Sequence, residues 1–220
     1  MNAEFLETMF VTFKLAGITT FFLFFIGIAL GYYLAFTKSR FKPFFETLVS
    51  MPLVLPPSVL GFYLLIAFSP ENFLGAFLRD NFEIHLVFSF EGLVIASVLF
   101  SLPFMVQPIQ TGFSSLSKNM ISASYTLGKS KFETLIKVMI PNIQSSILSA
   151  TVITFAHTIG EFGVVLMIGG NIAGETKVAS IAIYDEVESL NYSVANQYAL
   201  TLFIISFTVL LIVYYIKKRD

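Results

Sequence analysis

Residues 15–37 read LAGITTFFLFFIGIALGYYLAFT, a stretch of 23 residues that contains no Asp, Glu, Lys or Arg. A helix needs about 20 apolar residues to cross the hydrocarbon core of a bilayer. An amphipathic helix of a soluble protein would carry a charge every few residues. The stretch therefore predicts a membrane-spanning helix. The composition agrees, because charged residues make up only 12 % of the 220 residues and hydrophobic residues 56 %, whereas soluble domains carry about 25 % charged residues.

Four further stretches lack charged side chains in the same way: 47–70, 92–117, 138–160 and 189–216, of which the third continues past Glu161 to residue 174. Together the five stretches predict an all-α integral membrane protein, in which residues 1–220 form a single multi-pass transmembrane domain in contact with membrane lipid. We expect spans at about 10–37, 47–69, 91–112, 138–168 and 196–216. A cytoplasmic loop at about 113–137 would join the third span to the fourth.

The charges between these stretches predict the orientation. Ten of the thirteen basic residues lie in three alternate segments: Lys38, Arg40 and Lys42; Lys118, Lys129, Lys131 and Lys137; Lys217, Lys218 and Arg219. The remaining segments are mainly acidic. Because cytoplasmic loops carry the excess of Lys and Arg, we expect the N-terminus outside and the C-terminus inside.

Several kinds of function are excluded by what the chain lacks. Without cysteine there is no thiolate metal site and no cysteine nucleophile, and there is no basic stripe for nucleic acid. His85 and His157 stand far apart with no ligand cluster around them, so we expect no metal. Gly128-Lys129-Ser130 resembles the end of a phosphate-binding loop, but Ala123 occupies the position of its other glycine. We therefore expect no cofactor on this chain, and no nucleophile–base set indicates an enzyme.

Two ionisable residues fall within the fourth apolar stretch. His157 and Glu161 are four residues apart, which places them on one face of a continuous helix. An ionisable residue inside a span costs about 2.5–3.5 kcal/mol on insertion scales, so it should face protein or a water-filled path. The pair either forms a hydrogen bond that fixes helix packing or belongs to a gate or pathway. Because like charges repel, we do not expect Glu161 to bind an anionic substrate directly.

Prolines interrupt the second apolar stretch. Pro52, Pro56 and Pro57 lie in a short run, and the last two are well inside the apolar residues. They either begin a helix, where proline is tolerated, or break the span so that freed carbonyls face protein or a water-filled cavity. Pro103 and Pro108 repeat this pattern in the third stretch.

The basic loop between the third and fourth stretches carries a recognisable motif. It reads Ser122-Ala123-Ser124-Tyr125-Thr126-Leu127-Gly128, followed by Val138, Ile140 and Pro141. This segment resembles the coupling loop of type I ABC importer permeases, in which EAA, three residues, Gly, nine residues and Ile-x-Leu-Pro follow one another. Ser122 replaces the acidic first residue of that motif, and Ser124 replaces its second alanine. The resemblance implies that Ser122, Ala123, Ser124, Tyr125, Thr126, Leu127, Gly128 and Pro141 couple the chain to an ATPase.

Further motifs extend the resemblance over about residues 8–216. Those similar to molybdate-type permeases are Pro52-Leu53-Val54-Leu55-Pro56-Pro57 with Gly61-Phe62, Gly160-Glu161-Phe162-Gly163, Gly170-Asn171-Ile172-Ala173-Gly174-Glu175-Thr176, and Ile183-Tyr184. Ala173 stands in place of a proline, and His157 in place of an arginine. The pathway or gate candidates are His157, Gly160, Glu161, Phe162, Gly163, Pro56 and Pro57.

The resemblance implies a type I permease fold in a bacterial inner membrane, with two copies of the chain forming a pathway on a two-fold axis. Its implied partners are a cytoplasmic ABC ATPase dimer that holds ATP and Mg, and a periplasmic oxyanion-binding protein. A short helix around residues 121–127 would seat in the ATPase and end at Gly128. Lys129, Lys131 and Lys137 either meet an acidic rim of that partner or only anchor the loop on the inner side.

Three transport hypotheses remain open at this point. The first is ATP-driven import of molybdate or tungstate, which the molybdate-type motifs favour. The second is a sulfate or thiosulfate permease of the same family. The third is a secondary transporter or channel that works without an ATPase.

Overall fold

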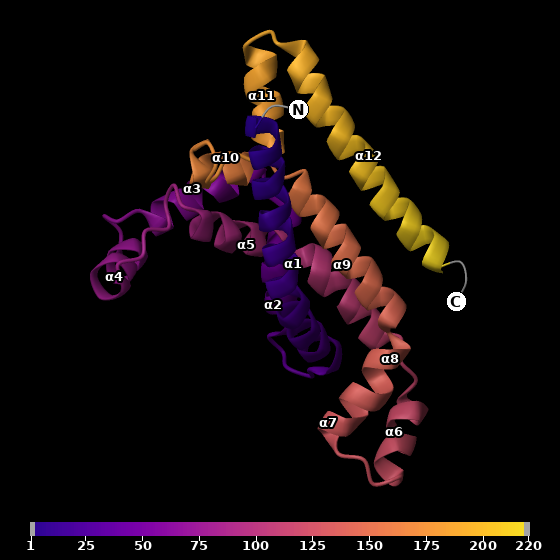
Figure 1. Ribbon diagram of the computed structural model, residues 1–220. Coiled ribbons are helices and arrows are strands. Elements are labelled where there is room, and N and C mark those ends of the chain that lie inside the picture. The colour runs from indigo at the N-terminus through magenta and orange to yellow at the C-terminus, as the bar shows by residue number, and fades with distance from the viewer. Residues whose placement is uncertain (1–2, 218–220) are drawn as a thin grey trace.

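The computed structural model describes residues 3–217, and every regular element in this range is helical, which confirms the all-α prediction (Figure 1). The elements are α1 (Ala3–Phe36), α2 (Lys42–Val54), α3 (Pro57–Phe68), α4 (Phe73–Phe82), α5 (Phe90–Ser114), α6 (Lys118–Thr126), α7 (Lys131–Thr134), the π-helical turn η1 (Leu135–Met139), α8 (Ile140–Asn142), α9 (Gln144–Ile159), α10 (Gly163–Gly169), α11 (Ala179–Glu188) and α12 (Tyr192–Lys217). Lys218 and Arg219, which contributed to the predicted orientation, lie outside the described residues.

Three of these helices, α1, α5 and α12, are each long and apolar enough to cross a membrane. Two bent pairs pass the same test together: α2 with α3, bent by 112°, and the α7–α8 segment with α9, bent by 73°. If each bent pair is one span, the described residues contain five spans. The arrangement of the helices does not test the predicted orientation, which stays a prediction.

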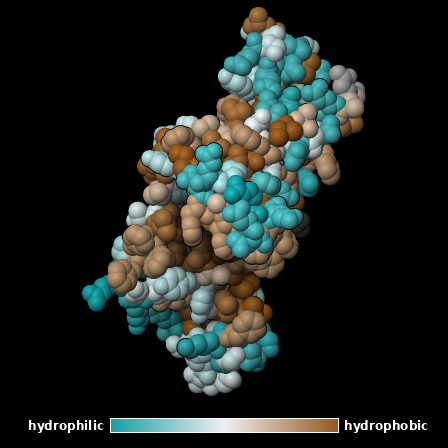
Figure 2. Space-filling view, turned by 90° about the vertical axis from the view of Figure 1, so that its left-hand side faces the viewer, coloured by the Kyte–Doolittle hydropathy of each residue, from teal (hydrophilic) through white to brown (hydrophobic). Residues whose placement is uncertain are grey.

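Helix α5 lies at the centre of the packing, against α1, α2, α9 and α10. Leu15 and Leu23 of α1 and Leu93 and Met105 of α5 are fully buried in the core. Figure 2 shows one face of the molecule, where hydrophobic residues gather in the middle around a hydrophilic patch and hydrophilic residues predominate at the upper end. Helix α12 leans away from the other helices and packs on α11 and α9 (Figure 1).

The prolines act differently in the two spans that contain them. Leu55 and Pro56 are extended, both with ψ 135°, and α3 begins at Pro57. The second span is therefore broken at these residues, which was one of the two interpretations of the prolines. Helix α5 runs without a break through Pro103 and Pro108. The extension of the proline pattern to the third span is therefore wrong, because the packed neighbours of α5 hold it helical around both rings.

Candidate functional site

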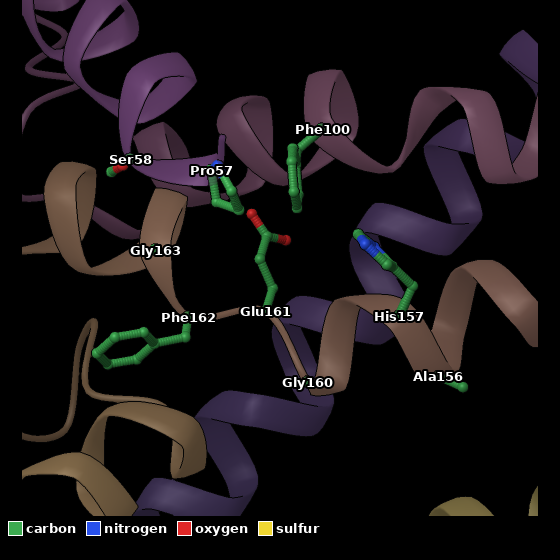
Figure 3. Close-up of a pocket in the computed structure, with 9 residues that line it drawn as sticks. All are labelled: Pro57, Ser58, Phe100, Ala156, His157, Gly160, Glu161, Phe162 and Gly163. Atoms are coloured by element: carbon green, nitrogen blue, oxygen red, sulfur yellow. The ribbon is translucent and has the colours of Figure 1, made fainter. Parts of the chain in front are cut away.

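Most of the predicted pathway candidates meet in one cavity of about 680 Å³ at the break between α9 and α10 (Figure 3). We call it the Glu161 hollow. Its lining residues are Pro57, Ser58, Phe100, Ala156, His157, Gly160, Glu161, Phe162 and Gly163. Pro57 and Ser58 open α3, Phe100 belongs to α5, and Gly163 opens α10. Pro56 is not part of the lining, because it precedes α3 as its exposed N-cap.

The predicted helical relation between His157 and Glu161 is wrong. Helix α9 ends at Ile159, and Gly160 caps it, so Glu161 lies in the break rather than one turn above His157. Among the described residues the two side chains share no hydrogen bond, and Nδ1 of His157 lies instead 3.0 Å from Oγ of Ser101. The interpretation as a hydrogen-bonded pair therefore fails, although both side chains line the same hollow.

A chain of hydrogen bonds fixes the His157 ring. The Thr158 hydroxyl donates to the Thr154 carbonyl oxygen at 2.9 Å, so the Ser101 hydroxyl can donate to Thr158 at 3.1 Å and accept from His157. This arrangement uses every polar hydrogen once and places a proton on Nδ1. The ring also stacks on Phe104, with centroids 3.9 Å apart. Nε2 is then the nitrogen without a partner among the described residues.

Glu161 is held by its backbone and left unpaired at its carboxyl group. Its carbonyl oxygen accepts from the Ser180 hydroxyl at 2.6 Å, and its N–H donates to Thr158 at 3.3 Å. The side chain is only 3 % exposed, and neither carboxyl oxygen has a hydrogen-bond partner among the described residues. In Figure 3 the carboxyl group points toward Pro57 and Phe100. An unpaired buried polar group is costly, so it marks a place that a further polar group could complete.

Close packing joins the two helices that open at the hollow. A Cβ on Gly163 would lie 2.9 Å from Cβ of Pro57, whereas a Cβ on Gly160 would meet nothing closer than 3.7 Å. Gly163 is thus needed for the approach of α10 to α3. Phe162 turns the other way and packs on Tyr184, with ring centroids 5.1 Å apart.

The coupling loop, residues 113–137, contains the predicted short helix as α6. Gly128 ends it with φ +77°, its N–H donates to the Tyr125 carbonyl at 3.0 Å, and the Lys129 N–H donates to Ser124 at 3.2 Å. This pair of bonds is a Schellman cap, which places glycine in the left-handed region. The prediction that Gly128 ends this helix is therefore confirmed.

Helix α7 of the coupling loop is capped and tied to α6. Ser130 and Glu133 form a capping box, and the Ser124 hydroxyl lies 2.9 Å from the buried Thr134 hydroxyl. Nζ of Lys137 and Nζ of Lys129 lie 3.0 Å and 3.6 Å from Glu133. The Lys137 hydrogen bond, the Ser130 N–H and the Lys129 charge hold the pKa of Glu133 below its ordinary value. Two of the four lysines in residues 113–137 are thus engaged within the loop itself.

The outer surface of the coupling loop carries several large apolar side chains. Leu127 is 80 % exposed and Phe132 72 %, and Tyr125 and Ile136 are also exposed. Ser122, Ala123 and Thr126 are exposed beside them, whereas Ser124 is buried. Pro141 lies in α8, just after η1, where the Ile140 N–H reaches back to the Leu135 carbonyl. Figure 1 places α6 and α7 together at one end of the molecule.

Several residues of these two regions escaped the sequence analysis. Ser58, Ser101 and Phe100 join the hollow from distant segments, and nothing in their local sequence indicates this. The capping box was readable, because Ser130-x-x-Glu133 is its sequence pattern.

Comparison with known proteins identifies the family. Residues 27–219 match the family described as "Binding-protein-dependent transport system inner membrane component". The chain belongs to this family. It is 41 % identical over 204 residues to the molybdenum transport system permease protein ModB of Azotobacter vinelandii, covering 93 % of this chain and 90 % of that protein. It is 31 % identical to a probable sulfate transport system permease protein, cysT, of Zygnema circumcarinatum, covering 95 % of this chain and 72 % of that protein.

A solved structure supports the fold. The chain superposes on a subunit of a bacterial ABC transporter involved in the import of the acidic polysaccharide alginate with a TM-score of 0.83, at 16 % identity. The match covers 100 % of this chain and 80 % of the other. The permease is therefore a multi-pass inner-membrane subunit of an ABC importer with the type I fold, and its family consists of transport components rather than enzymes.

Proposed function

We propose that the permease forms the channel of an ATP-driven importer of molybdate, with tungstate as a close variant. Two copies of the chain would enclose the pathway. A cytoplasmic ABC ATPase dimer would bind and hydrolyse ATP with Mg, and a periplasmic binding protein would deliver the oxyanion.

The observation that carries the coupling role is the exposed apolar surface of the coupling loop. Leu127 and Phe132 are exposed, at the end of a segment whose caps and side-chain bonds make it stiff. Large exposed apolar side chains at a stiff tip are typical of a protein-docking surface. A partner that closes around this tip would move α5 and α9 with it, since the loop joins them.

The substrate is argued from the relatives. The relative at 41 % identity is named for molybdenum transport, which favours molybdate. The relative named for sulfate transport makes sulfate or thiosulfate the second candidate. The two anions share charge and tetrahedral shape, so the fold alone does not favour either.

The test is uptake into proteoliposomes that contain the permease, its ATPase and its binding protein. We expect uptake of radioactive molybdate to need ATP, to be blocked by excess tungstate and to persist in excess sulfate. Block by sulfate alone would favour the second candidate. Equal uptake by the permease without ATPase would contradict the ATP-driven mechanism and support a secondary transporter.

A further inference from the structure

We propose that the Glu161 hollow is a binding subsite for the oxyanion inside the permease, and that the anion enters it together with protons. The anion would be held by the N-terminus of α3, by protonated His157 and by the O–H of a neutral Glu161 carboxyl group. This inference rests on the proposed function, because it names a site inside the permease where the transported oxyanion binds.

The N-terminus of α3 supplies the first contact. The N–H groups of Val59 and Leu60 bond to the Pro56 carbonyl oxygen, whereas the Ser58 N–H has no acceptor among the described residues. Ser58 is also one of the residues that line the hollow. The first turn of a helix carries a partial positive charge, and its free N–H groups bind anions. The 112° break between α2 and α3 places this helix start against the hollow instead of leaving it at a membrane surface.

The unpaired carboxyl group of Glu161 is an independent sign of a ligand. It is buried, its oxygens form no hydrogen bond among the described residues although the Ser97 hydroxyl lies nearby, and it lines the same hollow as Ser58. As a carboxylate it would repel an oxyanion. As a neutral acid it has an O–H to donate, and an oxyanion is an acceptor. The sequence-based expectation that Glu161 avoids the anion thus holds only for its charged form.

His157 supplies the positive charge. Its Nδ1 is committed to Ser101, so the proton that charges the ring goes to Nε2. One proton taken from water converts Nε2 from an acceptor into a charged donor. A dianion in a site lined by Phe100 and Pro57 needs such a charge, because burial of an unpaired ion is costly.

No other titratable side chain among the described residues lines the hollow, so only His157 and Glu161 can change its charge. The flanking α3, α5 and α10 contribute Ser58, Phe100 and Gly163 to the lining, and α1, α11 and α12 contribute no titratable side chain to it. The hollow is therefore uncharged when both residues are neutral and becomes selective for an anion when His157 is protonated.

The two histidines of the chain allow a direct test. We would label histidine with 15N in the full-length permease in nanodiscs, without binding protein or ATPase, and add molybdate. The variant His85→Gln assigns the two imidazole signals and serves as the control, because exposed His85 lies in a different hollow beside Glu83 and Glu91. We expect molybdate to move the His157 signals toward the protonated form, and to leave His85 unchanged.

Equilibrium dialysis with radioactive molybdate measures the same site without NMR. Binding should weaken by up to about tenfold between pH 7 and pH 8, which is the limit when one proton binds with the anion. His157→Gln should weaken it at least about tenfold at pH 6 through loss of a charge-assisted hydrogen bond. Glu161→Gln, which keeps a donor, should bind within about threefold of the unchanged chain, whereas Glu161→Ala should not. Co-purification with the ATPase confirms that each variant is folded.

Two results separate this inference from the proposed function. If the assembled complex imports molybdate but His157 does not respond to it and His157→Gln binds as well as the unchanged chain, the subsite is refuted while the function stands. If the purified permease binds molybdate as described but the complex does not import it, the proposed function fails instead.

Discussion

Polar side chains of the coupling loop are hydrogen-bonded to one another, whereas the buried carboxyl group of the Glu161 hollow has no hydrogen bond among the described residues. In the coupling loop Ser124 pairs with Thr134, Ser130 with Glu133, and Glu133 with Lys129 and Lys137. In the hollow the Glu161 carboxyl oxygens have no partner among the described residues, and neither has the nearby Ser97 hydroxyl. A segment with all its bonds made internally moves as one body, whereas a site with open bonds awaits a ligand. The comparison separates the part that we propose transmits motion from the part that we propose meets the substrate.

The largest expected effect comes from breaking the stiff segment at Gly128. Proline has φ near −65°, which is incompatible with φ +77° at this residue, and it removes the N–H bond to Tyr125. We expect Gly128→Pro to reduce ATP-driven uptake by at least about tenfold, since strain of this kind costs about 1–3 kcal/mol and redirects the loop. Gly128→Asn, which tolerates the left-handed region, is the matched control. Normal uptake by the proline variant would remove the coupling loop from the mechanism.

The second largest expected effect is a loss of stability that distinguishes Gly163 from Gly160. In Gly163→Ala the new methyl group would meet Cβ of Pro57 at 2.9 Å, while in Gly160→Ala it meets only ordinary contacts. Overpacking of this kind costs about 1–3 kcal/mol. We expect a lower thermal midpoint in nanodiscs for Gly163→Ala and little change for Gly160→Ala. Equal midpoints would show that α10 and α3 are free to separate.

A smaller effect tests the buried hydroxyl pair of the coupling loop. Thr134→Val leaves the Ser124 hydroxyl buried without its partner, which costs about 1–2 kcal/mol. Trypsin should then cut at Lys129 and Lys131 about 5–30 times faster, because cleavage follows the population of the opened loop.

The double variant Ser124→Ala/Thr134→Val is the control for that pair. With both hydroxyls removed no polar group is left unpaired, so cleavage should return toward the original rate. Additive acceleration in the double variant would mean that the two hydroxyls act independently.

The smallest effect is a pH dependence of the loop tip. The Lys137 hydrogen bond, the Ser130 N–H and the Lys129 charge lower the pKa of Glu133 from its ordinary 4.5. A lowered folded-state pKa contributes stability above pH 4.5 that is lost only as the pH falls through the lower folded value. A dye on Leu127→Cys should therefore keep constant anisotropy from pH 8 to pH 5 and become more mobile below about pH 4.5.

Glu133→Gln provides the control, because it removes the titrating group. The dye should then show the same mobility over the whole pH range. A transition that persists in this variant would belong to another carboxyl group.

The sequence predicted those features that local chemistry decides. The helical spans follow from uncharged stretches, and the end of α6 follows from a glycine that adopts the left-handed region. The break before α3 is one of the two alternatives that the run of prolines left open. The resemblance to type I permeases then indicated the family that the comparisons showed.

The features that the sequence missed depend on packing between distant segments. Helix α9 ends at Ile159, and Gly160 was a possible helix end, but the apolar residues continue past Glu161 to residue 174 and favoured a longer helix. The continuity of α5 at Pro103 depends on its neighbours rather than on its own residues. The approach of Ser58 to the hollow follows from the α2–α3 bend, whose angle is set by tertiary contacts.

The central claim is that the coupling loop lies in the cytoplasm and is covered by a separate ATPase. The chain has no cysteine, so a single Leu127→Cys variant reports only on the loop tip. With a membrane-impermeant maleimide, we expect labelling in inverted vesicles but not in intact cells, and loss of that labelling when the ATPase is bound. Labelling from outside intact cells, or unchanged labelling with the ATPase present, would contradict the account.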